Sequence, residues 1–231
     1  MNWAIPVNWA TLVRAVAASP GDSGDGMSGG PGPAMKLPRV MLLCTGNAAR
    51  SVMAGALVKA SRVPVEVTTA GTHAVEGQPP SLRVVEAMAG LGVSLGGHRS
   101  HQIADTDLAE VDLVVAMERD HVAYVRRRHP QAASRTATLP WLASHLPGGP
   151  DGLAGRVSRL ELAELPLDVQ GEVTDPAGGD VSRYEACAKE IAALVAKLGA
   201  RLQGDLHHAG QAARVAAFAL GVPSSYTEPA R

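Results

Sequence analysis

A cysteine and an arginine separated by five residues are the residue types that phosphoryl chemistry needs. They bound the segment Cys44-Thr45-Gly46-Asn47-Ala48-Ala49-Arg50, which Ser51 follows. A thiolate is a nucleophile, and a planar guanidinium presents two parallel donors that match two oxygens of a phosphate. The spacing arises easily by chance in a chain with many arginines, so the elements around it decide its meaning.

The segment lies between a predicted strand and a predicted helix. Residues 40–43 form an apolar run typical of a buried strand, and residues 51–62 have the apolar spacing of a helix. The loop between them can curl so that its amides point inward at the helix N-terminus, where they would bind a tetrahedral oxyanion and favour a thiolate. Gly46 would permit the tight backbone, and Ser51 can hydrogen-bond the sulfur. We expect these residues to bind phosphate: Thr45, Gly46, Asn47, Ala48, Ala49, Arg50 and Ser51.

A thiolate that attacks phosphorus also needs an acid that protonates the leaving group. The segment Asp175-Pro176-Ala177-Gly178-Gly179-Asp180 offers one. The proline restricts Asp175, and the glycines place it on a turn before the last predicted helix. An Asp-Pro pair alone predicts only a turn, so this assignment depends on the cysteine segment.

Strands and helices alternate along the chain. Further strands are predicted over residues 63–69, 111–117 and 135–139, and further helices over 81–91, 119–128 and 181–202. This order is typical of an α/β protein, and we predict a three-layer fold in which a four-stranded parallel sheet is flanked by helices.

Composition divides the chain into three parts. Residues 1–37 include a stretch rich in Gly, Pro and Ser and are expected to form a disordered leader; Met27 and Met35 offer later translation starts. Residues 38–204 are expected to form the domain, with an extended loop near 147–173 that contains a short helix near 156–162. Residues 205–231 are expected to form a C-terminal helix and tail.

The overall counts exclude several classes of protein. A net charge of −1 argues against nucleic acid as a partner, and no apolar run is long enough to predict a membrane span. Two cysteines, Cys44 and Cys187, cannot build a disulfide framework or a four-thiolate metal site, which favours a cytoplasmic location. The oligomeric state is not indicated.

With both segments in place, residues 40–202 resemble the low-molecular-weight protein tyrosine phosphatase family. Leu43 before the cysteine and the downstream position of Asp175 distinguish this class from the larger tyrosine phosphatases. The resemblance implies that Thr69 and His98 hold Asn47 from outside the phosphate site. It continues through three further segments, which are Thr69-Ala70-Gly71-Thr72, Gly97-His98-Arg99-Ser100-His101-Gln102 and Asp112-Leu113-Val114-Val115-Ala116-Met117.

The resemblance also implies a mechanism. Cys44 would attack the phosphorus to form a phosphocysteine, and Asp175 would protonate the leaving oxygen and then act as base for the hydrolytic water. Arg50 and the loop amides would stabilise the equatorial oxygens. No metal or other cofactor is implied. The substrate would be a phosphorylated protein of the phosphotyrosine type or a small aryl phosphomonoester.

The chain departs from the family pattern at several positions. Ala49 replaces a second loop cysteine, Val52 replaces a proline, and Ala177 and Gly178 stand where aromatic residues flank a phosphotyrosine ring. Trp141 and His73 are therefore candidates for a cleft wall.

Two other functions remain open. The arsenate reductases of this fold share the loop, but Cys187 is the only other thiol in the chain, so an external thiol would be needed. The second open function is that of an inactive relative, which would bind phosphate without hydrolysing a substrate. Protein-arginine phosphatases of the family carry Thr where this chain has Ala48.

Overall fold

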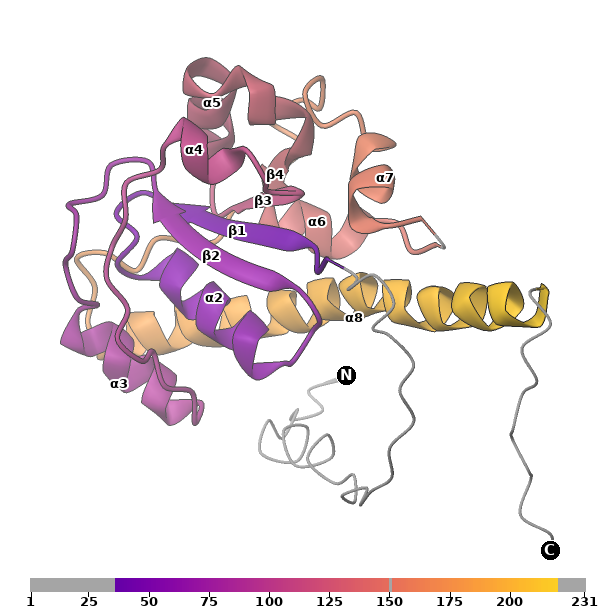
Figure 1. Ribbon diagram of the computed structural model, residues 1–231. Helices are drawn as coiled ribbons and strands as arrows, with labels where there is room; N and C mark the ends of the chain where they lie inside the picture. The colour runs from indigo at the N-terminus through magenta and orange to yellow at the C-terminus, as the bar shows by residue number, and fades with distance from the viewer. Residues whose placement is uncertain (1–35, 150, 220–231) are drawn as a thin grey trace, which may run out of the picture.

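The computed structural model describes residues 36–149 and 151–219, with side chains through Gln203. Four parallel strands form one sheet in the order β2-β1-β3-β4 (Figure 1). The strands are β1 (Arg39–Cys44), β2 (Glu66–Gly71), β3 (Leu113–Ala116) and β4 (Thr136–Thr138). The predicted α/β fold with a four-stranded parallel sheet is confirmed.

Seven α-helices and one 3₁₀-helix accompany the sheet in the described part of the chain. They are α2 (Arg50–Ala60), α3 (Leu82–Gly90), α4 (Asp105–Leu108), α5 (Arg119–Arg128), η1 (Pro130–Arg135), α6 (Leu139–His145), α7 (Leu153–Ser158) and α8 (Val181–Ala219). The sequence did not predict α4, η1 or α6, because elements this short are stabilised by tertiary contacts rather than by their own periodicity. Helix α8 continues without a break past residue 205, where a separate helix was expected.

The two ends of the chain were also assigned from sequence. The disordered leader expected over residues 1–37 lies outside the described residues, apart from Lys36 and Leu37. The tail beyond residue 219 also lies outside them.

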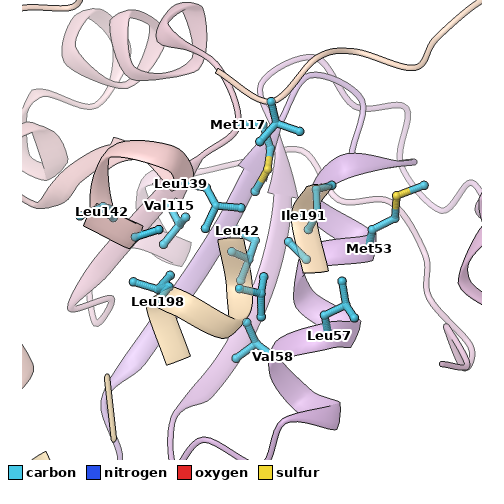
Figure 2. Close-up of a cluster of buried hydrophobic side chains, with 14 of the residues drawn as sticks. Leu42, Met53, Leu57, Val58, Val115, Met117, Leu139, Leu142, Ile191 and Leu198 are labelled. Atoms are coloured by element: carbon cyan, nitrogen blue, oxygen red, sulfur yellow. The ribbon is translucent and has the colours of Figure 1, made fainter. Parts of the chain in front are cut away.

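Helices cover both faces of the sheet (Figure 1). Because side chains alternate along a strand, Leu42 of β1 faces the helices α2, α6 and α8, whereas Met41 and Leu43 pack with Val125 of α5 on the other face. The larger core lies on the α2–α8 side, where Leu42, Leu57 and Ile191 meet (Figure 2).

The segment expected to be an extended loop over residues 147–173 contains α7 and is anchored to the domain. The amide of Val173 donates to Met117 O at 2.8 Å, beside the end of β3. Arg126 of α5 donates to Leu162 O and Leu165 O at 2.8 and 2.6 Å. These contacts bring residue 175 to the carboxyl edge of the sheet.

Replacing Ile191 with Ala tests the α8 side of the core. Ile191 is fully buried, so the cavity should lower the free energy of unfolding by about 3 kcal/mol in urea denaturation. Lys197→Ala on the exposed side of α8 is the control and should change it by less than about 0.5 kcal/mol. Equal effects of the two changes would contradict this packing.

Candidate active site

The loop of residues 45–49 leaves the carboxyl end of the central strand and enters α2. Cys44 is the last residue of β1, and Arg50 is the first residue of α2. Both side chains are buried, with 3% of Cys44 and 2% of Arg50 exposed. The loop therefore closes over a thiol and a guanidinium at the edge where parallel sheets bind their ligands.

The amides of this loop are available to an anion. Within residues 36–149 and 151–219, the N–H groups from Thr45 to Ser51 donate to no protein acceptor, and the first such bond runs from the amide of Met53 to Ala49 O. No side chain caps α2. A helix N-terminus with free donors and a positive dipole end favours a bound oxyanion.

Asn47 supplies the special backbone conformation of the loop. Its φ is +49°, in the left-handed region that Asn tolerates better than most residues. Gly46 was expected to permit the tight turn, but its φ is not in that region. The signal for this turn was the asparagine next to the glycine.

Polar contacts hold Asn47 from outside the loop. Its Oδ1 accepts from the His101 amide at 2.9 Å, and its backbone oxygen lies 2.9 Å from His98 Nε2. Thr69 was expected to share this task, yet among the described contacts it makes no hydrogen bond to Asn47. Its methyl group instead faces Gly55 on α2, where an added Cβ would lie 2.6 Å from it.

Ser51 contacts the sulfur of Cys44, the candidate nucleophile. Its Oγ lies 3.0 Å from Cys44 Sγ and accepts from Asn47 Nδ2 at 2.9 Å. A thiolate has no hydrogen to give, so when Cys44 is ionised the Ser51 hydroxyl is the donor of this contact. A hydrogen bond of this kind stabilises the thiolate relative to the thiol.

Two carboxylates orient the Arg50 guanidinium. Nη2 lies 2.7 Å from Asp175 Oδ2, and Nη1 lies 2.6 Å from Glu118 Oε1. Nη1 also donates to Val173 O at 3.2 Å. The Asp175 side chain remains 43% exposed, and its Oδ1 accepts from the Ala177 amide at 3.0 Å. The carboxyl group expected to be the acid therefore lies beside the arginine of the loop.

His121 of α5 also contacts the loop, and its ring is neutral. Burial is the main cause that lowers its pKa to about 4, and the Arg50 charge adds to the shift. Its Nδ1 accepts from the Glu118 amide at 3.1 Å, so the ring proton is on Nε2. Nε2 therefore donates to Thr45 Oγ1 at 2.9 Å.

Sequence reasoning missed Glu118 and His121 as parts of the site. Their position shortly after β3 could have identified them. Strands β1 and β3 are parallel neighbours, so residues that follow β3 lie at the same carboxyl edge as the end of β1.

Three further residues that the sequence singled out, His73, Trp141 and Cys187, pack against other parts of the protein. His73 packs edge-on against Tyr124, with ring centroids 5.4 Å apart, whereas Trp141 stacks on His145 within α6. Cys187 is buried, and burial raises the pKa of its thiol to about 12. Among the described residues, no group of three or more His, Cys, Asp or Glu could hold a metal, and no helix is long and apolar enough to cross a membrane.

A thiol and an arginine at the two ends of an anion-binding loop, with a carboxyl group beside them, define a cysteine-dependent phosphatase site. The model of the family described as low molecular weight phosphotyrosine protein phosphatase matches residues 39–147. A protein-arginine-phosphatase of Geobacillus stearothermophilus is 31% identical over 166 residues, which cover 71% of this chain and 96% of that protein. The low molecular weight protein-tyrosine-phosphatase Etp of Escherichia coli K12 is 30% identical over 109 residues, which cover 47% and 74%.

Solved structures agree with this result. An arginine phosphatase from Geobacillus stearothermophilus has a TM-score of 0.61 at 29% identity, over 74% of this chain and 97% of that one. A low molecular weight protein tyrosine phosphatase from T. tengcongensis has a TM-score of 0.56 at 28% identity, over 70% and 97%. The chain belongs to the low molecular weight phosphotyrosine protein phosphatase family.

The neutral state of His121 predicts acid sensitivity. Its folded pKa of about 4 lies below the ordinary 6.5, so its contribution to stability is complete above pH 6.5 and decreases as the pH falls. At pH 4 the loss should reach about 3 kcal/mol. Urea denaturation at pH 7 and pH 4 should show a smaller difference for His121→Gln than for the natural chain. An equal difference would show that this ring is not the titrating group.

Proposed function

We propose that this chain hydrolyses phosphate from phosphorylated protein side chains of the phosphotyrosine type, and from small aryl phosphates, through a phosphocysteine. One observation supports it above all. Cys44 ends β1 at the start of a loop whose seven amides, from Thr45 to Ser51, bond to no acceptor within the described residues, and the buried Arg50 that closes the loop contacts Asp175. A nucleophile, oxyanion donors and an acid around one tetrahedral site are what this chemistry requires, and this arrangement supports that assignment.

In the first step, the Cys44 thiolate attacks phosphorus as the bond to the leaving oxygen breaks. The loop amides and Arg50 bind the three equatorial oxygens, which carry the charge of the transition state. Phosphate oxygens take the place of Asp175 as partner of Nη2. Asp175, as the general acid, delivers a proton to the leaving oxygen.

In the second step, water attacks the phosphocysteine. Asp175, now a carboxylate, takes a proton from the water, and the sulfur leaves as a thiolate that Ser51 stabilises through its 3.0 Å contact. Inorganic phosphate is released. The same carboxyl group serves as acid and then as base, so no metal is required.

Phosphoarginine is a second candidate substrate. The relative that is matched over 96% of its length is a protein-arginine-phosphatase, and the mouth of the site carries the carboxylates of Asp175 and Glu118. Carboxylates favour a cationic guanidinium leaving group. Ala48 argues against it, because the arginine phosphatases that this chain resembles carry Thr there.

Hydrolysis is a better account of the site than arsenate reduction. Reduction needs a further thiol near the first, and Cys187 is held as the neutral thiol by burial, with a pKa of about 12. An external thiol would have to supply this step. A reducing compartment such as the cytoplasm also suits a thiolate nucleophile without a partner cysteine in its loop.

Replacing Cys44 tests the nucleophile. Cys44→Ser and Cys44→Ala should each lower turnover of p-nitrophenyl phosphate by about 10³-fold or more, because covalent catalysis is lost. Both variants should still bind inorganic phosphate in calorimetric titrations, because the amides and Arg50 remain. Full turnover by either variant would exclude the phosphocysteine.

Replacing Asp175 with Asn tests the acid. Turnover of phenyl phosphate, which has a poor leaving group, should fall by about 10²-fold, and that of p-nitrophenyl phosphate should fall less. Asp180→Asn, on the same turn, is the matched control and should leave the ratio of the two rates unchanged. Equal losses on both substrates would assign Asp175 a role other than proton donation.

Matched peptides identify the substrate class. Peptides of one sequence that carry phosphotyrosine, phosphoarginine or phosphoserine should be compared by phosphate release. We expect phosphotyrosine to be hydrolysed fastest. A preference for phosphoarginine would support the second candidate, and hydrolysis of phosphoserine alone would contradict both.

A further inference from the structure

A second, basic groove adjoins the phosphate loop. It has a volume of about 540 Å³ and is lined by Thr72, His73, Gln102, Tyr124, Arg127 and Arg128. Two backbone bonds join its wall to the loop. The Thr72 amide donates to Cys44 O at 2.9 Å, and the His73 amide donates to Thr45 O at 2.8 Å. A peptide whose phosphorylated residue enters the loop would therefore have its neighbouring residues close to this groove.

The groove carries two arginines whose charge is not used inside the protein. Arg127 and Arg128 are exposed at the end of α5, and within the described part of the chain neither guanidinium makes a hydrogen bond or ion pair. The preceding Arg126 is different, because its guanidinium binds Leu162 O and Leu165 O. Cations favour a helix C-terminus, but that effect does not require three in succession.

Two carboxylates that contact the groove lining or the residue after α5 already have other partners. Glu76 accepts from the Gln102 amide at 2.7 Å and lies 3.2 Å from His101 Nδ1. Asp105 lies 2.6 Å from His129 Nδ1 and also accepts from Gln131. These acids therefore have partners other than Arg127 and Arg128, and the groove keeps a positive character.

The floor of the groove is held in place before any ligand arrives. Gln102 accepts from the Ala74 amide at 2.8 Å and donates to Thr72 O at 3.0 Å. The His73 ring packs edge-on against Tyr124. A floor fixed in this way loses little conformational entropy when a peptide binds.

We propose that this groove binds an acidic side chain of the protein substrate, located within a few residues of the phosphorylated residue. A carboxylate matches the guanidinium groups of Arg127 and Arg128 in charge and in geometry. Each residue of an extended peptide spans about 3.3 to 3.6 Å, so the residues next to the phosphorylated one are those that can reach a groove adjoining the loop. The inference rests on the proposed function and adds a rule for choosing substrates.

The test measures binding and does not need turnover. Two phosphotyrosine peptides are compared by calorimetry, one with Asp and Glu beside the phosphorylated residue and one with Asn and Gln, and a second pair carries phosphoarginine. In the full chain with Cys44→Ser, the acidic peptide should bind about tenfold more tightly at low salt. Removing both charges by Arg127→Ser and Arg128→Ser should reduce this preference to less than about twofold.

A matched control removes two charges at the far end of α2. Lys59→Gln with Arg62→Asn lowers the net charge equally, and Asn suits position 62, where φ is +53°. This control should keep the tenfold preference. An unchanged preference in the arginine variant, an equal loss in the control, or no preference in any peptide pair would overturn the proposal.

The same peptides separate this inference from the proposed function. An acidic preference that needs Arg127 and Arg128, in a natural chain that releases no phosphate, would overturn only the proposed function. Phosphate release without any acidic preference would overturn only the groove.

Discussion

The buried charge of Arg50 is the constraint on which the site depends. A guanidinium that is 2% exposed must be paired, because an isolated charge in the protein interior costs several kcal/mol. Its partners come from distant parts of the chain: Glu118 follows β3, and Asp175 lies 125 residues away. Pairing this one side chain therefore joins the loop, the start of α5 and the segment before α8.

The same constraint explains why the long segment before Asp175 is packed rather than loose. Val173 donates its amide to Met117 O and accepts from Arg50 through its own oxygen. Each backbone group of this residue therefore ties the acid loop to the sheet edge or to the phosphate loop. A carboxyl group held in this way needs little reorganisation for the proton transfer that we propose.

The loop itself is supported from β2 and from the segment after α3. Gly71 lies so close that an added Cβ would be 2.6 Å from Thr45 O and 2.9 Å from Asn47 N. His101 and His98 contact Asn47 through its side chain and its backbone oxygen. The neutral His121 ring also donates to Thr45, and it adds no charge near the Cys44 sulfur. The amides thus keep their positions while they remain free for an anion.

The sequence by itself determined the order of the four strands and of the longer helices, the parallel sheet and the strand–loop–helix segment from Cys44 to Ser51. Hydrophobic periodicity and a local turn are properties of neighbouring residues, so they can be predicted without the fold. The approach of Asp175 to Arg50 was a hypothesis from sequence, and the contact itself depends on chain packing over 125 residues. Only the tertiary structure decided that Glu118 pairs with Arg50 and that the His101 amide rather than Thr69 binds the Asn47 side chain. It also decided that Arg127 and Arg128 line a groove whose wall is bonded to the loop. The physical reason is that these contacts join residues far apart in the chain, and their partners are set by which strands become neighbours and by the cost of leaving a buried polar group unpaired.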